Sequence, residues 1–554
     1  MELSNEKRRF LNSGSSIYLL LPIVALAACS PQIDTSRTNA GASSENPDYA
    51  PDGWLARSLP EIAEGLRSGE VTAEDLVTAY IERIERIDWS GPRLRSVLTL
   101  NTDAVADARA AGAKREAGEE LGPLHGVPIL LKDNIESADP VATTAGALAL
   151  KDNVTGRDSP LVAGLREAGA IILGKANLSQ WANFRSNHSL SGWTALGGQV
   201  RNPHMLDRSP CGSSSGSGAA VSASLAAGAV GTETNGSIIC PAQVNGIVGF
   251  KPTVGLVSQQ HIVPISASQD TAGPMTKTVR GAAMMLVAMA TGPAKLDYVA
   301  ALDENALDGA RVGVLRFAQG SNPDIIERFD RALEVLAAAG ATLVEIEKFE
   351  RPESFQDQSG NVLNYEFKAG INAYLADAAA AVPVRTLDEL IAFNQEHADV
   401  ELALFDQSIF VESAAKGSLE DPDYIASRDG VQALTRDKGI DALLASAELD
   451  VLVSPSGPLA SRIDPVNGDV WPAWAGAGWM AAIAGYPHAS VPMGTVHGVP
   501  VGLSFIATKD TDAAVLGYAY AYEQRTNHRP EPQYFPNAEA RPEIATAMEG
   551  TLRE

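Results

Sequence analysis

The sequence predicts an α/β fold with a central mixed, mostly parallel sheet flanked by helices and with a helical insertion. Short apolar runs typical of buried strands alternate along the chain with segments whose apolar residues recur at helical spacing. The 554 residues are 45% hydrophobic and 20% charged, which is enough apolar material for a sizeable core. A prior of about 150 residues per domain would suggest three or four domains, but large α/β folds routinely exceed that length.

The first predicted helices begin at polar capping residues. Ser58 and Glu61 have the spacing of a capping box, and Thr72 precedes a segment with one apolar face. A further helix is expected to begin at Ser159 and end near Gly169. Strands are expected over residues 127–131, 171–173, 312–315, 342–346, 451–453, 489–491 and 501–506, with a helix over 323–339. The segment from about 355 to 445 is charged, rich in alanine and helical in pattern, and it predicts the insertion.

Composition excludes several classes of protein. The chain has 43 basic and 68 acidic residues and a formal net charge of -25, so a phosphate backbone would be repelled. Nucleic acid is therefore not expected as a partner. Three cysteines are too few for a disulfide scaffold or a Cys-rich zinc domain.

The N-terminal residues resemble a bacterial lipoprotein leader. A basic cluster precedes an apolar run over residues 16–28, which is shorter than the roughly 20 residues of a spanning helix and is followed by Cys29. This order resembles a lipobox and implies a signal peptide over 1–28 with lipidation at Cys29. An ordinary leader that happens to precede a cysteine is the alternative. The predicted localisation is periplasm-facing and lipid-anchored to a bacterial membrane, with Ser30 favouring the outer one.

The rest of the chain divides by composition. Residues 29–52 are rich in Ser, Asn, Pro, Asp and Ala and predict a flexible tether. One large domain is expected over residues 53–535, with the helical insertion inside it. Residues 536–554 are then a C-terminal tail.

A segment of small residues carries the chemistry. Residues 212–231 read GSSSGSGAAVSASLAAGAVG and contain no charge. A flexible linker is one interpretation, but the Ala, Val and Leu content favours a packed helix opened by a loop whose N–H groups can bind an oxyanion. The first five residues also fit the G-x-S-x-G nucleophile elbow of α/β-hydrolases, which would need a later acid and a histidine such as His488.

Several motifs together resemble the amidase signature family. The resemblance covers residues from about 55 to 530 and rests on these segments: LHGVPILLKDNI (124–135), CGSSSGSGAA (211–220), GTETNGSIICPA (231–242), VGFKPTVGLVS (248–258), AGYPHASVPMG (484–494) and PVGLSFIA (500–507). The run over 201–218 is most similar to bacterial peptide amidases, which remove the C-terminal amide of peptides. The resemblance implies the amidase-signature fold.

The resemblance also implies a Ser-Ser-Lys triad that needs no metal or cofactor. Lys132 is then the base, Ser213 the bridging serine, which the family holds in a cis peptide, and Ser237 the nucleophile. Supporting roles fall to the hydroxyl of Ser214 and to the backbone N–H groups of the oxyanion hole, at Thr234, Asn235, Gly236 and the nucleophile itself.

Physical chemistry supports the same assignment. A lysine takes a proton from serine only when it is neutral, so burial without a carboxylate partner must lower its pKa. The strand over 127–131 would place Lys132 at the end of a buried strand. Ser213 could then pass the proton from Ser237, and water would hydrolyse the acyl-enzyme.

Other residues around the triad allow more than one interpretation. Cys211 and Cys240 flank the two serines, and a disulfide is possible, but buried thiols are the preferred interpretation. Three residues depart from the common family pattern, and these departures bear on the substrate pocket: Gln180, Asn235 and Ile239. Candidate apolar walls, each also explicable as ordinary packing, are Trp181, Phe184, Tyr365, Trp471, Trp474 and Trp479.

The leading hypothesis is a serine amidohydrolase that cleaves carboxamide C–N bonds, with a small amide or peptide C-terminal amide as its substrate. Two alternatives are an ester or lactam hydrolase with the same triad and a lipid-anchored solute-binding protein. In the leading hypothesis, the protein contacts the membrane through the N-terminal lipid only. An amidotransferase subunit has the same fold, but it needs cytoplasmic partners, against which the leader argues. No pattern in the sequence indicates the oligomeric state.

Overall fold

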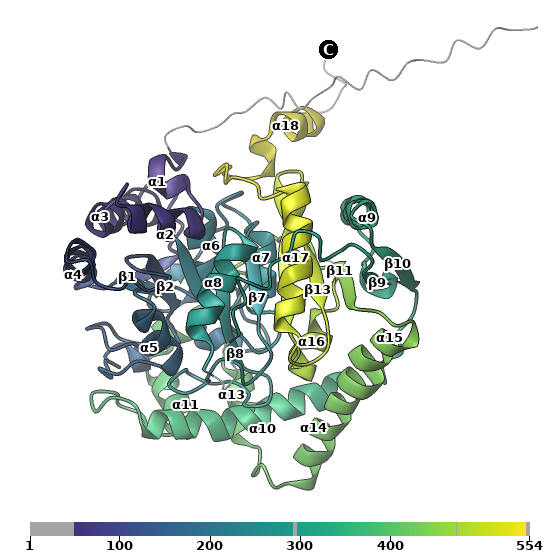
Figure 1. The fold of residues 1–554 in the computed structure, drawn as a ribbon. Helices are drawn as coiled ribbons and strands as arrows, with labels where there is room; N and C mark the ends of the chain where they lie inside the picture. The colour runs from purple at the N-terminus through teal and green to yellow at the C-terminus, as the bar shows by residue number, and fades with distance from the viewer. Residues whose placement is uncertain (1–48, 292–295, 472–473, 550–554) are drawn as a thin grey trace, which may run out of the picture. The chain divides into compact units, whose positions relative to one another are not determined.

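The computed structural model describes residues 49–291, 296–471 and 474–549. Most strands form one 11-stranded sheet with the spatial order β1-β3-β2-β6-β8-β7-β12-β13-β11-β9-β10 (Figure 1). Its strands are β1 (Val97–Leu100), β2 (Pro128–Lys132), β3 (Ile171–Ala176), β6 (Gly228–Glu233), β7 (Val248–Lys251), β8 (Thr271–Thr276), β9 (Arg311–Leu315), β10 (Thr342–Ile346), β11 (Val451–Pro455), β12 (His488–Val496) and β13 (Val499–Ile506). A separate pair is formed by β4 (Trp193–Thr194) and β5 (Gly198–Gln199).

The sheet is mixed, with its parallel pairs on the two flanks. On one flank β2 runs parallel to both β3 and β6, and on the other β9 runs parallel to both β10 and β11. Antiparallel pairs fill the middle, where β12 and β13 are joined by a tight turn. The predicted α/β fold with a mixed sheet between helices is confirmed.

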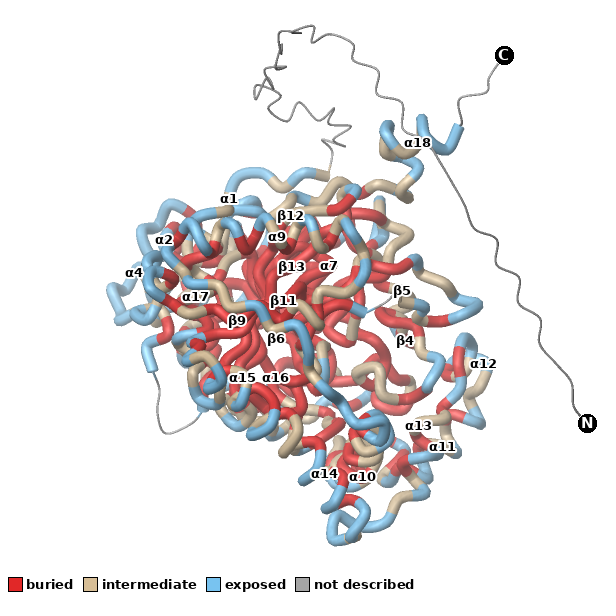
Figure 2. The backbone as a smooth tube through the Cα atoms, turned by 90° about the vertical axis from the view of Figure 1, so that its right-hand side faces the viewer, coloured by how far each residue is buried: buried red, intermediate tan, exposed pale blue. Residues whose placement is uncertain are grey.

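Helices cover the sheet, and their ends follow local sequence signals. The capping box between Ser58 and Glu61 is formed, and Thr72 accepts a hydrogen bond from the N–H of Asp75 at 3.1 Å. The helices outside the insertion are α1 (Gly53–Ala56), α2 (Leu59–Ser68), α3 (Ala73–Arg83), α4 (Ala104–Glu116), α5 (Pro160–Glu167), α6 (Ser215–Ser222), α7 (Ile239–Val244), α8 (Val279–Met289), α9 (Pro323–Ala338), α16 (Gly478–Ala484), α17 (Asp512–Thr526) and α18 (Pro542–Glu549). Figure 2 shows buried residues concentrated in the strands and exposed residues on the outer helices.

A helical layer lies between β10 and β11 in the chain. Its helices are α10 (Phe355–Ala376), α11 (Leu387–Glu396), α12 (Ala398–Glu401), α13 (Ser408–Ala414), α14 (Pro422–Thr435) and α15 (Asp441–Ser446). In Figure 1 the long helices α10 and α14 run along the lower side of the molecule. An apolar cluster joins this layer to the core: Phe367, Ile371 and Phe410 pack with Trp181 and Val263.

The predicted domain boundaries stay predictions. The proposed leader over 1–28 and most of the proposed tether over 29–52 lie outside the described residues, as does Cys29.

Candidate active site

Lys132 ends strand β2 and is fully buried. Its Nζ lies 2.8 Å from Ser213 Oγ, 2.8 Å from Thr232 Oγ1 and 3.1 Å from the carbonyl oxygen of Thr232. Because β2 and β6 are parallel neighbours, their carboxyl ends meet at one edge of the sheet, which brings Lys132 to the loop that follows β6. No carboxylate is among the hydrogen-bond partners of Nζ in the described part of the chain.

The electrostatics of Lys132 favour its neutral form. Burial lowers the pKa of its amine from 10.5 to about 7, while the charges of Asp270 and Glu233 oppose that shift. The neutral amine has a lone pair and two N–H bonds, so it can accept the proton of Ser213 while donating to Thr232. The pKa of Lys132 is therefore lowered, as the sequence predicted for a buried base.

Ser213 lies in the turn that leads into helix α6. The peptide bond between Gly212 and Ser213 is cis, and Ser213 is fully buried. Gly216, in the first turn of α6, allows a close backbone approach, because a Cβ there would lie 2.3 Å from the carbonyl oxygens of Asn177 and Ser96. The uncharged small-residue segment is thus a packed helix that opens beside the lysine, as the sequence predicted.

Ser237 lies in the short loop between β6 and helix α7. The N–H of Ser214 donates to the carbonyl oxygen of Ser237 at 3.1 Å, so the two serine-containing loops are in direct contact. Glu233 Oε2 accepts from the N–H groups of Ile238 and Ile239 at 2.8 and 3.0 Å and so fixes the start of α7. Ser237 is 8% exposed and lines a large cavity.

The loop before Ser237 presents unused backbone donors. The N–H groups of Asn235, Gly236 and Ser237 donate to no other described residue. Gly236 has φ of +83°, and a Cβ at this position would meet no atom within 4 Å, so the loop faces open space there. Free N–H groups on a fixed loop can stabilise an oxyanion. The arrangement is compatible with the oxyanion hole expected at Thr234, Asn235 and Gly236.

The two neighbouring cysteines form a disulfide. Cys211 and Cys240 are bonded, with their Cα atoms 5.9 Å apart. The preferred interpretation of buried free thiols is wrong, because the loop before Ser213 and the first turn of α7 lie against each other. The bond joins the two serine-containing segments covalently.

A cavity of about 1010 Å³ opens in front of Ser237. Four of the six candidate aromatic residues line it, namely Phe184, Trp471, Trp474 and Trp479. Trp181 and Tyr365 instead belong to packed apolar clusters. Of the three positions that depart from the family pattern, Asn235 and Ile239 line the cavity. Gln180 donates to Glu401 at 2.7 Å and is buried.

Three residues near the lysine, Thr232, Asn134 and Asp270, were not singled out in the sequence, whereas Ser214 was expected as a supporting residue. Thr232 accepts from Lys132 and also from Asn134 Nδ2 at 3.0 Å. Ser214 Oγ donates to the Thr232 carbonyl oxygen at 3.1 Å, so its contact with the triad is indirect. Asp270 accepts from Thr234 Oγ1 at 2.6 Å. The strand-end position of Thr232 beside the T-N-G-S motif was the available signal, whereas Asp270 is separated from the triad in sequence.

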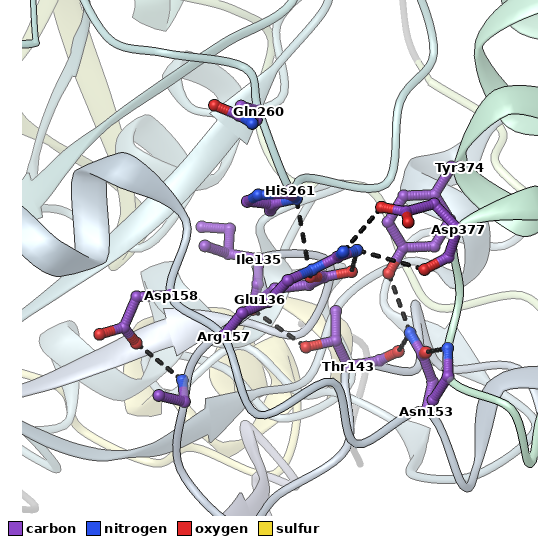
Figure 3. Close-up of polar contacts among 12 residues, drawn as sticks. Ile135, Glu136, Thr143, Asn153, Arg157, Asp158, Gln260, His261, Tyr374 and Asp377 are labelled. Carbon is purple, nitrogen blue, oxygen red and sulfur yellow. Dashed lines mark hydrogen bonds and ion pairs between the residues drawn. The ribbon is translucent and has the colours of Figure 1, made fainter.

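A second buried charge lies four residues beyond Lys132. Glu136 is fully buried and pairs with Arg157, whose Nε lies 2.5 Å from its Oε2 (Figure 3). Arg157 also pairs with Asp377 at 2.7 Å, beyond the end of α10, and His261 Nδ1 lies 3.9 Å from Glu136. This cluster ties the segment after Lys132 to the helical layer.

Comparisons with known proteins agree with this geometry. A family model described as Amidase matches residues 75–516. The solved structure of native peptide amidase from Stenotrophomonas maltophilia is 44% identical, with a TM-score of 0.83, over 87% of this chain and 100% of that one. A probable amidase of Arabidopsis thaliana is 35% identical over 86% of this chain and 91% of its own length. One glutamyl-tRNA(Gln) amidotransferase subunit, from Halorhodospira halophila, is 34% identical over 86% of this chain and 99% of its own.

These relatives contradict the predicted localisation on the periplasmic side of a membrane, held by a lipid. They are named as amidases and an amidotransferase subunit, and none of the three is named as a lipoprotein. Within residues 49–291, 296–471 and 474–549, no helix is long and apolar enough to span a membrane. The lipobox resemblance rested on a few residues, whereas these similarities extend over most of the chain.

Proposed function

The chain belongs to the amidase signature family and is a hydrolytic amidase, and from that premise we propose that it removes the amide group from the C-terminus of peptides with a Ser-Ser-Lys triad. The observation that carries the proposal is the contact of 2.8 Å between Ser213 Oγ and a buried lysine whose pKa is lowered to about 7. A base must be neutral to work near neutrality, and this lysine meets that requirement.

In the proposed reaction, Ser237 Oγ attacks the substrate carbonyl carbon. Its proton passes to Ser213 Oγ while the proton of Ser213 passes to Lys132 Nζ. The oxyanion that forms accepts hydrogen bonds from the N–H groups of the 234–237 loop. The protonated lysine then returns its proton through Ser213 to the leaving nitrogen, so that ammonia departs and an ester of Ser237 remains. Water, deprotonated through the same relay, hydrolyses this ester to the acid and restores the serine.

The shape and walls of the cavity support a peptide as the substrate. A volume of about 1010 Å³ is at the upper end of the range for small-molecule sites, and aromatic side chains offer apolar surface to peptide side chains. The similarity to peptide amidase, at 44% identity, exceeds that to the amidotransferase subunit, at 34%. The argument from the leader against an amidotransferase no longer applies, so the proposal depends on this difference and on the cavity.

The experiment is a product analysis on matched substrates. The purified protein is incubated with a peptide amide, the corresponding peptide methyl ester and a short aliphatic amide, and products are identified by mass spectrometry. We expect release of ammonia from the peptide amide, together with fluorophosphonate labelling that disappears in Ser237→Ala. Preferential hydrolysis of the ester would favour the esterase alternative. Stoichiometric ligand capture without labelling or turnover would contradict catalysis by Ser237.

A further inference from the structure

A chain of buried hydroxyl groups reaches the wall of the active-site cavity. His488 Nε2 lies 2.6 Å from Ser504 Oγ, and the Ser504 hydroxyl donates to Ser456 Oγ at 3.0 Å. Ser490 Oγ lies 2.8 Å from Ser456 Oγ. His488, Ser490 and Ser504 are fully buried on the paired strands β12 and β13, whereas Ser456 lines the cavity that Ser237 also lines. None of these four residues has a part in the proposed triad.

The histidine sets the direction of the chain. Burial lowers the pKa of His488 to about 3, so its ring is neutral and carries one N–H. His488 Nδ1 has no hydrogen-bond partner among the described residues. A buried N–H without an acceptor is less favourable than a lone pair without a donor, so the proton is on Nε2 and donates to Ser504.

The same count of donors and acceptors leaves the hydroxyl group of Ser456 with a hydrogen to donate. If Ser456 donated to Ser490, the fully buried Ser490 hydroxyl would have no acceptor in the part of the chain that the structure describes. Ser490 therefore donates to Ser456, which also accepts from Ser504. With both acceptor positions of its oxygen occupied, Ser456 has its O–H left to donate; no further partner of this hydroxyl is found among the described residues, and Ser456 lines the cavity.

Ser456 lies within reach of a substrate bound at Ser237. Both residues line the same cavity of about 1010 Å³. An extended peptide advances roughly 3.3–3.6 Å per residue, so a cavity of this size has room for the residue that precedes the amide group.

We propose that Ser456 is a substrate-binding residue whose hydroxyl donates a hydrogen bond to an upstream amide carbonyl of the substrate. The inference rests on the proposed function and specifies it further, because only a peptide amide or N-acylated amino-acid amide offers that second carbonyl. A simple carboxamide has only the carbonyl that Ser237 attacks. The fixed donor therefore favours peptide amides through binding.

The test compares two amides with the same phenyl group and carboxamide, of which one carries the second carbonyl group. N-acetylphenylalaninamide carries it, and 3-phenylpropanamide lacks the whole acetamido group. For Ser456→Ala we expect kcat/KM on the first amide to fall by about tenfold, mainly through a higher KM, because the lost bond acts equally in the ground and transition states. Turnover of the second amide should be unchanged, which also reports that the variant is folded. Ser456→Thr, which keeps the hydroxyl, should restore the preference.

Ser490→Ala is the matched control, since it removes a buried hydroxyl of the same network that does not line the cavity. It should change both amides by the same small factor. An equal loss on both amides in Ser456→Ala, or no loss on either, would overturn the inference while leaving the proposed function intact. Absence of turnover of both amides by the unaltered protein, with no fluorophosphonate labelling of Ser237, would instead contradict the proposed function and the inference together.

Discussion

Two buried titratable groups, four residues apart in the chain, differ in whether an opposite charge lies beside them. Lys132 is fully buried, and its hydrogen-bond partners among the described residues are neutral oxygens of Ser213 and Thr232. Glu136 is also fully buried, but it is paired with Arg157 at 2.5 Å. The hydrogen bond to Glu136 raises the pKa of Arg157 further above its ordinary value, whereas burial lowers the pKa of Lys132.

The difference separates a reactive group from a structural one. A buried charge without a counter-charge is costly, so burial favours release of the lysine's proton near neutrality, which the proposed role as a base requires. A buried charge with a counter-charge instead holds two segments together. Pairing, and not burial alone, decides which role a titratable side chain takes here.

The largest effect on activity is expected when Lys132, the buried group without a counter-charge, is replaced. Lys132→Met keeps the volume and burial of the side chain but abolishes the base. We expect kcat/KM on a peptide amide to fall by a factor on the order of 10⁴, as when a catalytic triad loses a member. The near-UV circular dichroism should be unchanged, because an uncharged side chain suits this environment. A variant that kept a substantial fraction of the rate would show that Lys132 is not the base.

The second prediction concerns pH. Lys132 must be neutral to accept a proton, and burial lowers its pKa to about 7, so kcat/KM should rise about tenfold per pH unit below 7 and level off above it. Stability follows the same group. Between about pH 7 and 10.5 the unfolded chain binds the proton that the folded chain has lost, so this lysine makes stability increase with pH in that window. A rate that was independent of pH between 5 and 8 would be incompatible with this base.

The third prediction concerns Glu136, the buried group that has a counter-charge. Glu136→Gln leaves Arg157 without its buried partner and should lower the free energy of unfolding by about 2 kcal/mol, less than for a fully buried pair because Arg157 is partly exposed. The expected change in kcat/KM is less than threefold. Urea denaturation measures the free energy of unfolding, and steady-state kinetics measures kcat/KM. Glu64→Gln, which breaks the exposed pair with Arg67, is the control and should change stability by less than about 0.5 kcal/mol.

The smallest predicted effect is a shift of the pH profile. Asp270 raises the pKa of Lys132 by its charge and accepts hydrogen bonds from the Thr234 hydroxyl and from two backbone N–H groups. An asparagine can keep these contacts with its oxygen toward the backbone and its amide toward Thr234. Asp270→Asn should therefore move the rising limb of the profile to lower pH with little change in the plateau. A shift to higher pH would contradict the electrostatic coupling.

Sequence patterns predicted the parts of the site that depend on local order. The apolar run before Lys132 was expected as a buried strand, and β2 ends at that lysine. The small-residue segment was expected as a packed helix, and α6 begins directly after Ser214. Local order determines such elements because burial and capping act over a few residues. The roles of the three triad residues stay predictions until the variants above are tested.

The missed features depend on contacts between distant segments. The Cys211–Cys240 bond forms only because two loops separated by 29 positions meet, and the presence of two cysteines does not reveal their distance. Asp270 follows α7 in the chain, directly before β8. The pairing of β6 with β8 brings it to Thr234. The donor network at Ser456 likewise needs the register of β11, β12 and β13. Such geometry is a property of the assembled sheet.

The disulfide has a topological consequence. Residues 211–240, which contain both Ser213 and Ser237, form a covalent ring, while Lys132 approaches it from outside by hydrogen bonds alone. A single protease cut anywhere between the two cysteines would leave both serines attached to one molecule. The nick would become visible on a gel only after reduction, and until then the two halves of the site would remain linked.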